Sequence, residues 1–187
     1  MNKFPKVLST TEMSNSFITG VAQICVVTHD HLKTLKGFVK MGIGPWAVTK
    51  LDEKRLSNTT YMGKEVTHSM VICNAFTGSM MWEIIEPLEG GSIYYDFLEK
   101  HGEGIHHVAV SYDEMTYKET VEKFQDLGCP VVQPGVCNGF PTAYFDTEKE
   151  IKTTLEIFEV PKNLIEMMKN RSGDFPEPDF WFPAKPE

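Results

Sequence analysis

An internal repeat constrains the fold more than any other feature of this sequence. A run typical of a strand begins at Gln23 and leads into a helical pattern that ends at Gly42, 19 residues later. A second run of the same kind begins at His107, and its helical pattern ends at Gly128, 21 residues later. Two matches in the same order and at similar spacing indicate two copies of one structural unit.

The later strands of the two copies match as well. Trp82–Glu86 and Leu155–Glu159 both read apolar-Glu-Ile-apolar-Glu. Each copy therefore has the order strand, helix and three strands, and we predict an α+β fold built from two βαβββ modules. The predicted strands are 18–28, 46–51, 59–61, 68–74, 80–86, 105–112, 131–133, 143–145 and 153–160, and the predicted helices begin after Asp30, at Ser92 and at Asp113.

The repeat also sets the expected division of the chain. We expect an N-terminal tail over 1–17, a first module over 18–90, a linker helix with the second module over 91–160, and a C-terminal helix with a proline-rich aromatic tail over 161–187. That last segment contains Phe180-Trp181-Phe182. Aromatic side chains each bury about 150–250 Å², so we expect these three to pack on the body of the domain or on a partner subunit.

Four polar residues interrupt otherwise apolar strands at equivalent places in the two copies. They are Gln23 and His107 in the first strands, and Glu83 and Glu156 in the last strands. Burying such groups without partners costs several kcal/mol each, and a shared metal ion would remove that cost. The alternatives are a hydrogen-bonded core histidine, solvent-facing carboxylates and a neutral core amide. If the modules pair about a pseudo-twofold axis, all four side chains converge on one concave face.

Two motifs, G-E-G-I-H-H-V-A-V and W-E-I-I-E-P-L, resemble those of the vicinal oxygen chelate superfamily. This superfamily includes glyoxalase I, methylmalonyl-CoA epimerase, extradiol dioxygenases and bleomycin-resistance proteins, and the resemblance covers residues 21–160. It implies a cup-shaped mixed sheet with flanking helices. The positions that match the family's metal ligands are Gln23, Glu83, His107 and Glu156. One divalent ion per site is implied, and this mostly oxygen donor set suits Zn, Ni, Co, Mn or Mg.

The ligand set narrows the chemistry that the resemblance implies. Gln23 stands where extradiol dioxygenases need a histidine, which argues against oxygen activation. The set is similar to that of animal-type glyoxalase I, whereas the loop after Glu86 and the G-I-H-H motif are more similar to the epimerases. Both branches remove a proton α to a carbonyl and stabilise the enediolate or enolate on the metal. The implied activity is therefore that of a metal-dependent isomerase or lyase.

Three residues are candidates for moving the proton. We expect Glu156 to be the base and Glu83 to face the opposite side of the substrate. His68 stands roughly where the epimerases are thought to carry a second carboxylate, and an imidazole can act as an acid or base near neutral pH. An exposed histidine at a strand end is the alternative for His68. His106 is expected to point to the other face of its strand and to be structural.

Two other functions fit the same resemblance. One is a small-molecule-binding protein that sequesters its ligand without catalysis, although such members usually lack the full ligand set. The other is a tailoring enzyme for a hydrophobic secondary metabolite. The chain has few arginines and aromatic-rich strands, which favours such a substrate over a CoA or glutathione conjugate.

Charge and composition limit the partners. The chain carries 18 Lys and Arg against 26 Asp and Glu, a formal charge of -8, with no basic patch, so we expect no nucleic-acid or membrane partner. A small-molecule carbonyl substrate is expected instead, and the resemblance implies a homodimer. No apolar run suits a signal peptide or a membrane span, which predicts a cytoplasmic protein. The cysteines are Cys25, Cys73, Cys129 and Cys137, and their wide spacing predicts buried, reduced thiols.

Overall fold

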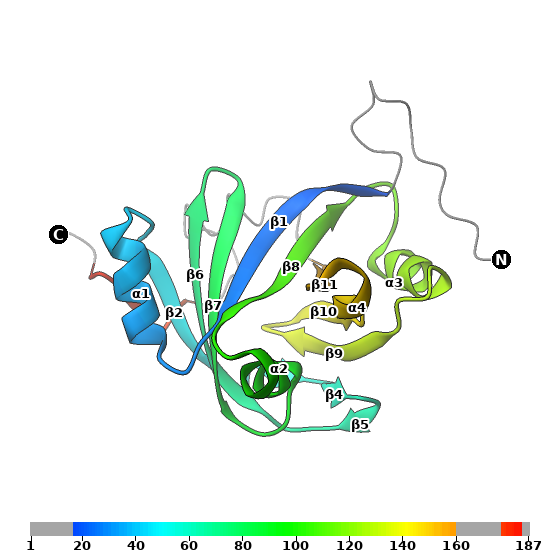
Figure 1. Cartoon of the computed structure of the whole chain (residues 1–187), viewed down its shortest axis with the longest axis horizontal. Helices are drawn as coiled ribbons and strands as arrows, with labels where there is room; N and C mark the ends of the chain where they lie inside the picture. The colour runs from blue at the N-terminus through cyan, green and yellow to red at the C-terminus, as the bar shows by residue number, and fades with distance from the viewer. Residues whose placement is uncertain (1–16, 160–176, 185–187) are drawn as a thin grey trace.

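The computed structural model describes residues 17–159 and 177–184 of the chain, and these form a strongly curved sheet with helices packed against it (Figure 1). The strands are β1 (Ile18–Val27), β2 (Trp46–Leu51), β3 (Leu56–Ser57), β4 (Thr60–Tyr61), β5 (Lys64–Glu65), β6 (Ser69–Thr77), β7 (Met80–Glu89), β8 (Gly104–Tyr112), β9 (Val131–Cys137), β10 (Phe140–Phe145), β11 (Thr154–Phe158) and β12 (Phe180–Phe182). The helices are α1 (His31–Lys40), α2 (Ile93–His101), α3 (Tyr117–Asp126) and α4 (Glu148–Ile151). Ten strands form one sheet in the order β12-β2-β6-β7-β1-β8-β11-β10-β9-β3, and β4 and β5 form a separate hairpin.

The sheet has the internal symmetry that the repeat predicts. At the centre of the sheet β1 runs antiparallel to β8. The other edge of β1 pairs in parallel with β7, and the other edge of β8 pairs in parallel with β11, so each first strand lies beside the last strand of its own module. In the central pair Gln23 lies opposite Ala109, and Cys25 lies opposite His107. Cys25 is two positions after Gln23, and Ala109 is two positions after His107. The pairing is therefore the same when the two strands are exchanged. The α+β fold of two βαβββ modules is therefore confirmed.

The two module helices begin differently. Asp30 caps α1 as predicted, and its side chain accepts a hydrogen bond from the backbone N–H of Lys33. The prediction that the second helix begins at Asp113 is wrong, because α3 begins at Tyr117. Thr116 and Glu119 form a reciprocal capping box there, which satisfies more backbone N–H groups than a single aspartate does.

Helices α1 and α3 cover the outer face of the sheet, whereas α2 packs on the concave side, beside the site. Leu35 of α1 packs against a buried cluster that includes Trp46 and Ile84. The ring of Phe124 in α3 stacks on Phe145, with centroids 4.4 Å apart. On the concave side a third cluster gathers around Tyr94 of α2. Along β7 the outward Ile84 alternates with the inward Glu83, so the pleat itself separates core from site.

Residues 52–67, which we call the strap, connect the two ends of the curved sheet. The strap follows β2, yet its strand β3 pairs with β9 of the other module, where Leu56 lies opposite Cys137. The backbone N–H of Met62 donates to the carbonyl of Val132 at 3.0 Å, and the hydroxyl of Tyr61 hydrogen-bonds to Asp96 of α2. The strap therefore closes one side of the cup.

The C-terminal aromatic segment adds a strand to the edge of the first module. β12 pairs antiparallel with β2, and Phe182 packs against the cluster beneath α1. Asp179 accepts a hydrogen bond from the backbone N–H of Lys50 and forms an ion pair with Arg55. Phe180 stays 45% exposed. The helix predicted after Pro161 lies outside the described residues.

Candidate metal centre

Four polar side chains that the sequence singles out meet at one place on the concave face. The amide nitrogen of Gln23 lies 2.7 Å from a carboxylate oxygen of Glu83, 3.2 Å from Nε2 of His107 and 3.3 Å from a carboxylate oxygen of Glu156. Nε2 of His107 lies 3.2 Å from Oε2 of Glu83 and 3.2 Å from Oε2 of Glu156, the two oxygens that the Gln23 amide also contacts. None of the four residues is more than 4% exposed. The structure therefore brings together every residue of the predicted donor set.

The strand register explains why these residues meet. Glu83 lies opposite Cys25, which is two positions after Gln23, and Glu156 lies opposite Ala109, which is two positions after His107. Residues two apart in a strand share a face, so each glutamate reaches the first-strand donor of its own module. The symmetry between β1 and β8 then puts the two donor pairs side by side.

The separations measured from the Gln23 amide and from His107 fit a divalent cation. Metal–ligand bonds of about 2.1 Å place neighbouring ligand atoms about 3.0–3.4 Å apart, and four of the five separations given above are 3.2 or 3.3 Å. A half turn of the Gln23 amide would present its oxygen to the ion. Two carboxylates, one imidazole and one amide oxygen form a mostly hard donor set, typical of Zn, Mn, Co, Ni or Mg sites.

Electrostatic coupling gives the same cluster a strong affinity for a proton. Burial lowers the pKa of His107, but the charges and hydrogen bonds of Glu156 and Glu83 outweigh burial and raise it to about 9. Burial also raises the pKa of Glu156, against the effect of the His107 charge. A cation that binds here must therefore displace a proton, so metal affinity should rise with pH up to about 9.

The expectation for His106 is wrong, because it lies beside His107 and not on the opposite face. The pairing of β1 with β8 shifts by one residue between His107 and Ile105, which leaves His106 in a bulge. Its Nδ1 is 2.8 Å from Nδ1 of His107, and burial lowers the pKa of His106 well below its usual value. A neutral His106 can accept the Nδ1 proton of His107, which leaves Nε2 free to face the site.

Each glutamate has a further support from the next strand. Asn74 lies opposite Glu83 and donates its amide N–H to the second carboxylate oxygen at 3.3 Å. Tyr144 lies opposite Glu156 and hydrogen-bonds to it, and Tyr94 donates to the Tyr144 hydroxyl at 2.9 Å. Sequence reasoning missed all three supports, because cross-strand register cannot be read from one strand at a time.

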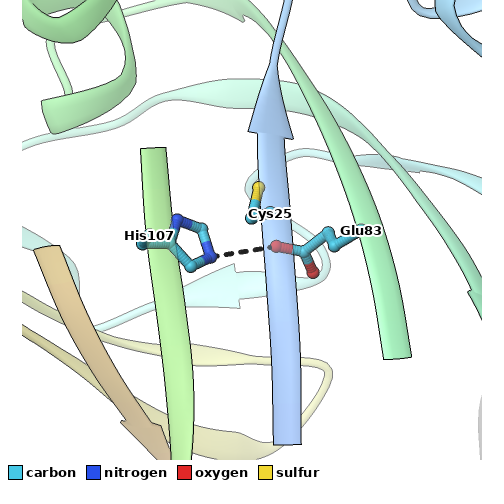
Figure 2. Close-up of side chains that lie close together, drawn as sticks. All are labelled: Cys25, Glu83 and His107. Carbon is cyan, nitrogen blue, oxygen red and sulfur yellow. Dashed lines mark ion pairs between the residues drawn. The ribbon is translucent and has the colours of Figure 1, made fainter. Parts of the chain in front are cut away.

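Cys25 is a fifth group at the site. Its Sγ lies within 4.8 Å of ligand atoms of Glu83 and His107 (Figure 2). All four cysteines are free, and Cys25 is fully buried. Burial and the neighbouring Glu83 raise the pKa of Cys25 well above its usual value, so the thiol keeps its proton. The strand pattern put Cys25 on the face of Gln23, but nothing in the sequence assigned it a place near the donors.

His68 immediately precedes β6 and lines the same cavity, only 6% exposed. Burial lowers the pKa of His68, so its imidazole is neutral at pH 7. Its Nδ1 has no hydrogen-bond partner among the described residues. Gly90 packs closely against His68, and only glycine fits at this position. Its φ is +79°, and a Cβ there would lie 2.8 Å from the His68 Cα. The exposed strand-end alternative is therefore excluded.

The donors face a cavity of about 130 Å³ that is walled mainly by apolar side chains. These side chains come from both modules and include Met70, Ile72, Met81, Val136 and Phe140. The strap contributes Leu56 and Thr59, and the segment before β12 contributes Pro178. Within 17–159 and 177–184, the only charged residues in the wall are Glu83 and Glu156, and no lysine or arginine lines it.

Comparison with known proteins gives a family and several structural neighbours. The model of the Glyoxalase/Bleomycin resistance protein/Dioxygenase superfamily matches residues 22–145, which is more than half of the chain. A hypothetical protein from Bacillus halodurans is 19% identical with a TM-score of 0.59, over 76% of this chain and 94% of its own. Methylmalonyl-CoA epimerase from Mycobacterium tuberculosis is 14% identical with a TM-score of 0.55, over 83% and 97%.

A methylmalonyl-CoA epimerase from Streptomyces coelicolor, in complex with 2-nitronate-propionyl-CoA, is 18% identical with a TM-score of 0.53, over 75% and 96%. At these identities the likeness concerns the fold. No curated protein sequence matches the chain. None of the described helices is long and apolar enough to cross a membrane.

Proposed function

The chain belongs to the glyoxalase/bleomycin resistance protein/dioxygenase superfamily, and within it we propose that this protein is a metal-dependent isomerase or lyase of glyoxalase or epimerase type. Its reaction removes a proton from the carbon next to a carbonyl group. The observation that carries the proposal is the convergence of four buried donors, two from each module, at separations that fit one divalent cation.

Each residue of the cluster has a part in holding the ion. Gln23, Glu83, His107 and Glu156 are the proposed ligands. His106 accepts the other ring N–H of His107, and Asn74 and Tyr144 hold the carboxylates by hydrogen bonds. When bound, the cation would polarise the carbonyl group and offset the negative charge that develops as the proton leaves.

Glu156 is the proposed base. Burial raises its pKa, which makes the carboxylate a stronger base than an exposed glutamate. Tyr144 hydrogen-bonds to this carboxylate, and Glu156 lines the cavity. Glu83 occupies the equivalent place in the other module, where it can return a proton to the opposite face of the substrate. His68 is a third candidate, because its neutral imidazole lines the same cavity.

A sequestering protein is the second candidate, and one observation favours it. Without a cation the cluster already satisfies itself, since Gln23 donates to both carboxylates and a protonated His107 pairs with both. The cup could therefore hold an apolar ligand without metal or chemistry. A protein of this kind would bind ligand equally well with and without a divalent ion.

Solvent deuterium exchange separates the two functions. The α-hydroxyketone 2-hydroxy-1-phenylethanone is incubated in D₂O with the metal-loaded protein, and exchange next to its carbonyl is followed by NMR. We expect Glu156→Gln, at matched metal occupancy, to lose about 10²–10⁴-fold in exchange rate. Glu159→Gln is the matched control, because Glu159 is exposed three positions further along. Exchange by Glu156→Gln at the wild-type rate would exclude Glu156 as the base, and no exchange by the wild type would favour sequestration.

We also propose that the protein acts as a homodimer, as the family resemblance implies. Light scattering coupled to size-exclusion chromatography measures the mass directly. A monomer at micromolar concentration would contradict the dimer without affecting the proposed chemistry.

A further inference from the structure

We propose that the cup binds a compact, neutral and mainly apolar carbonyl compound with a hydroxyl group at its far end, and not a coenzyme A or glutathione conjugate. This inference rests on the proposed function, because it names the substrate class of that same site. Three observations carry it: the charge balance of the centre, the closure of the cup by the strap, and the unpartnered imidazole of His68.

The charges of the centre balance without a charged ligand. Two glutamates and one divalent cation sum to zero when His107 binds the cation as a neutral imidazole. No lysine or arginine among the described wall residues adds a positive charge. The one guanidinium among the described residues, that of Arg55, is held by Asp179 and by the carbonyl of Lys50. A buried phosphate or carboxylate would therefore lack a counter-charge, and burying an unpaired anion is costly.

The size and closure of the cavity favour a compact ligand. An apolar cavity of about 150 Å³ accommodates a benzene ring, and this cavity measures about 130 Å³. The strap contributes Leu56 and Thr59 to the wall, while β3 and Met62 tie it to β9. A space of this size holds a single ring against the methionine and isoleucine side chains, and a long conjugating arm would have to lie outside it.

His68 points to a polar group on the ligand. His68 is among the residues that line the cavity, and its buried Nδ1 has no described partner, although buried polar atoms are normally hydrogen-bonded. The ring of Tyr94 is a neighbour of both imidazoles, 6.5 Å from that of His68 and 6.3 Å from that of His107. A ligand that reaches from the metal centre past Tyr94 meets His68 with its far end. A hydroxyl group there would give the orphaned nitrogen its hydrogen bond.

The structural neighbours that are methylmalonyl-CoA epimerases do not decide whether this chain binds a coenzyme A conjugate. One of them is methylmalonyl-CoA epimerase in complex with methylmalonyl-CoA, 18% identical to this chain. At that identity the fold is shared, and the residues that would recognise a charged arm are not thereby shared. Function resides in the site and not in the fold.

Calorimetric binding to the zinc-loaded and the metal-free protein tests charge and size together. The probes are 2-hydroxy-1-phenylethanone, propionyl-CoA and S-hexylglutathione. We expect the neutral ketone to bind the loaded protein at least tenfold more tightly than either conjugate. Equal or tighter binding of a conjugate overturns the inference while leaving the proposed function standing. If zinc does not bind, the proposed function fails; binding of the ketone to the metal-free protein still supports the inference, and no binding of the ketone to either form overturns it.

A second experiment tests the place of His68. The probe 2-hydroxy-1-(4-hydroxyphenyl)ethanone adds one phenol hydroxyl to the first ketone. We expect the wild type to bind it about three- to tenfold more tightly than the parent ketone, and His68→Leu to bind the two equally. His29→Leu is the matched control, since His29 is exposed and outside the cavity, and it should keep the wild-type preference. A preference that persists in His68→Leu, or that is absent in the wild type, overturns this part of the inference.

Discussion

The two modules share one scaffold but carry different side chains at equivalent positions. The glutamates are the same in both, Glu83 and Glu156. The other equivalent pairs differ: Gln23 and His107, Cys25 and Ala109, Asn74 and Tyr144. The symmetry of the backbone sets where donors stand, because the register around the pseudo-twofold axis is the same on both sides. The chemistry of each half depends on the residues that differ.

The first module, with Gln23 and Glu83, has a site whose neighbouring groups keep their charge, and we call it the holding half. The second module, with His107 and Glu156, has groups that gain or lose a proton, and we call it the titrating half. In the first module Glu83 accepts hydrogen bonds from the amides of Gln23 and Asn74, and amides do not change charge. In the second module the phenol of Tyr144 hydrogen-bonds to Glu156, and the pKa of both His107 and Glu156 is raised. Nε2 of His107 lies 3.2 Å from both glutamates, so the halves differ in the residue that supports each carboxylate from the next strand. We therefore assign ligand binding to both halves but proton transfer mainly to the second.

The largest expected effect is the loss of zinc affinity when a proposed metal ligand in the first strand of either module, His107 or Gln23, is replaced. His107→Ala should lower zinc affinity by at least about 1000-fold, or about 4 kcal/mol, because it removes the nitrogen ligand. Gln23→Ala should lower it less, since a neutral amide oxygen is the weaker donor. His106→Ala should cost about 10–100-fold, as is usual for a residue that orients a ligand. Calorimetry measures all three, and equal losses in His107→Ala and His106→Ala would contradict the assignment of His107.

The pH dependence of stability isolates the titrating half. In the metal-free protein the pKa of His107 is about 9, against about 6.5 for an unfolded histidine. Because the folded state binds this proton more tightly, its stabilisation is complete below about pH 6.5 and is lost as pH rises to about 9. We expect a loss of up to about 3 kcal/mol in the free energy of unfolding.

Urea unfolding of the metal-free protein at pH 6.5 and pH 9 provides the measurement. His107→Gln should lack this loss, and zinc-loaded wild type should lack it too because the bound imidazole carries no proton. A metal-free protein that is as stable at pH 9 as at pH 6.5 would place the proton elsewhere.

Removing one supporting hydrogen bond from each glutamate sharpens the comparison. Tyr144→Phe and Asn74→Ala should each reduce stability by about 1–2 kcal/mol. Only Tyr144→Phe should shift the pH profile of deuterium exchange to higher pH, because the Tyr144 hydrogen bond lowers the pKa of Glu156. A profile shift in Asn74→Ala of the same size would mean that both glutamates transfer protons.

The smallest effect concerns the outermost strand on the edge of the first module. β12 lies on the edge of β2, whereas β3 of the strap takes the equivalent place beside β9 in the second module. Phe182 is partly buried beneath α1, so Phe182→Ala should reduce stability by about 1 kcal/mol. Phe180→Ala, which removes a 45% exposed ring, is the control and should cost less. Equal losses in thermal unfolding would contradict the observed packing of the segment.

The repeat made much of the fold and the donor set predictable from sequence. The repeat put Gln23, Glu83, His107 and Glu156 at equivalent positions in the two modules, and their convergence on one face was predicted on the condition that the modules pair about a pseudo-twofold axis. Tyr144 and Asn74 could not be found in this way, because their roles depend on cross-strand register. His106 was misplaced because a bulge breaks the alternation on which the prediction relied. The start of α3 was misplaced because two residues can compete as caps.

Anomalous X-ray scattering from crystals grown with zinc tests most directly whether the two modules share one metal. We expect one peak per chain, about 2.0–2.2 Å from Nε2 of His107 and from an oxygen of each of Gln23, Glu83 and Glu156. A peak bound by the residues of one module only, or no peak between β1 and β8, would contradict a centre built from both halves.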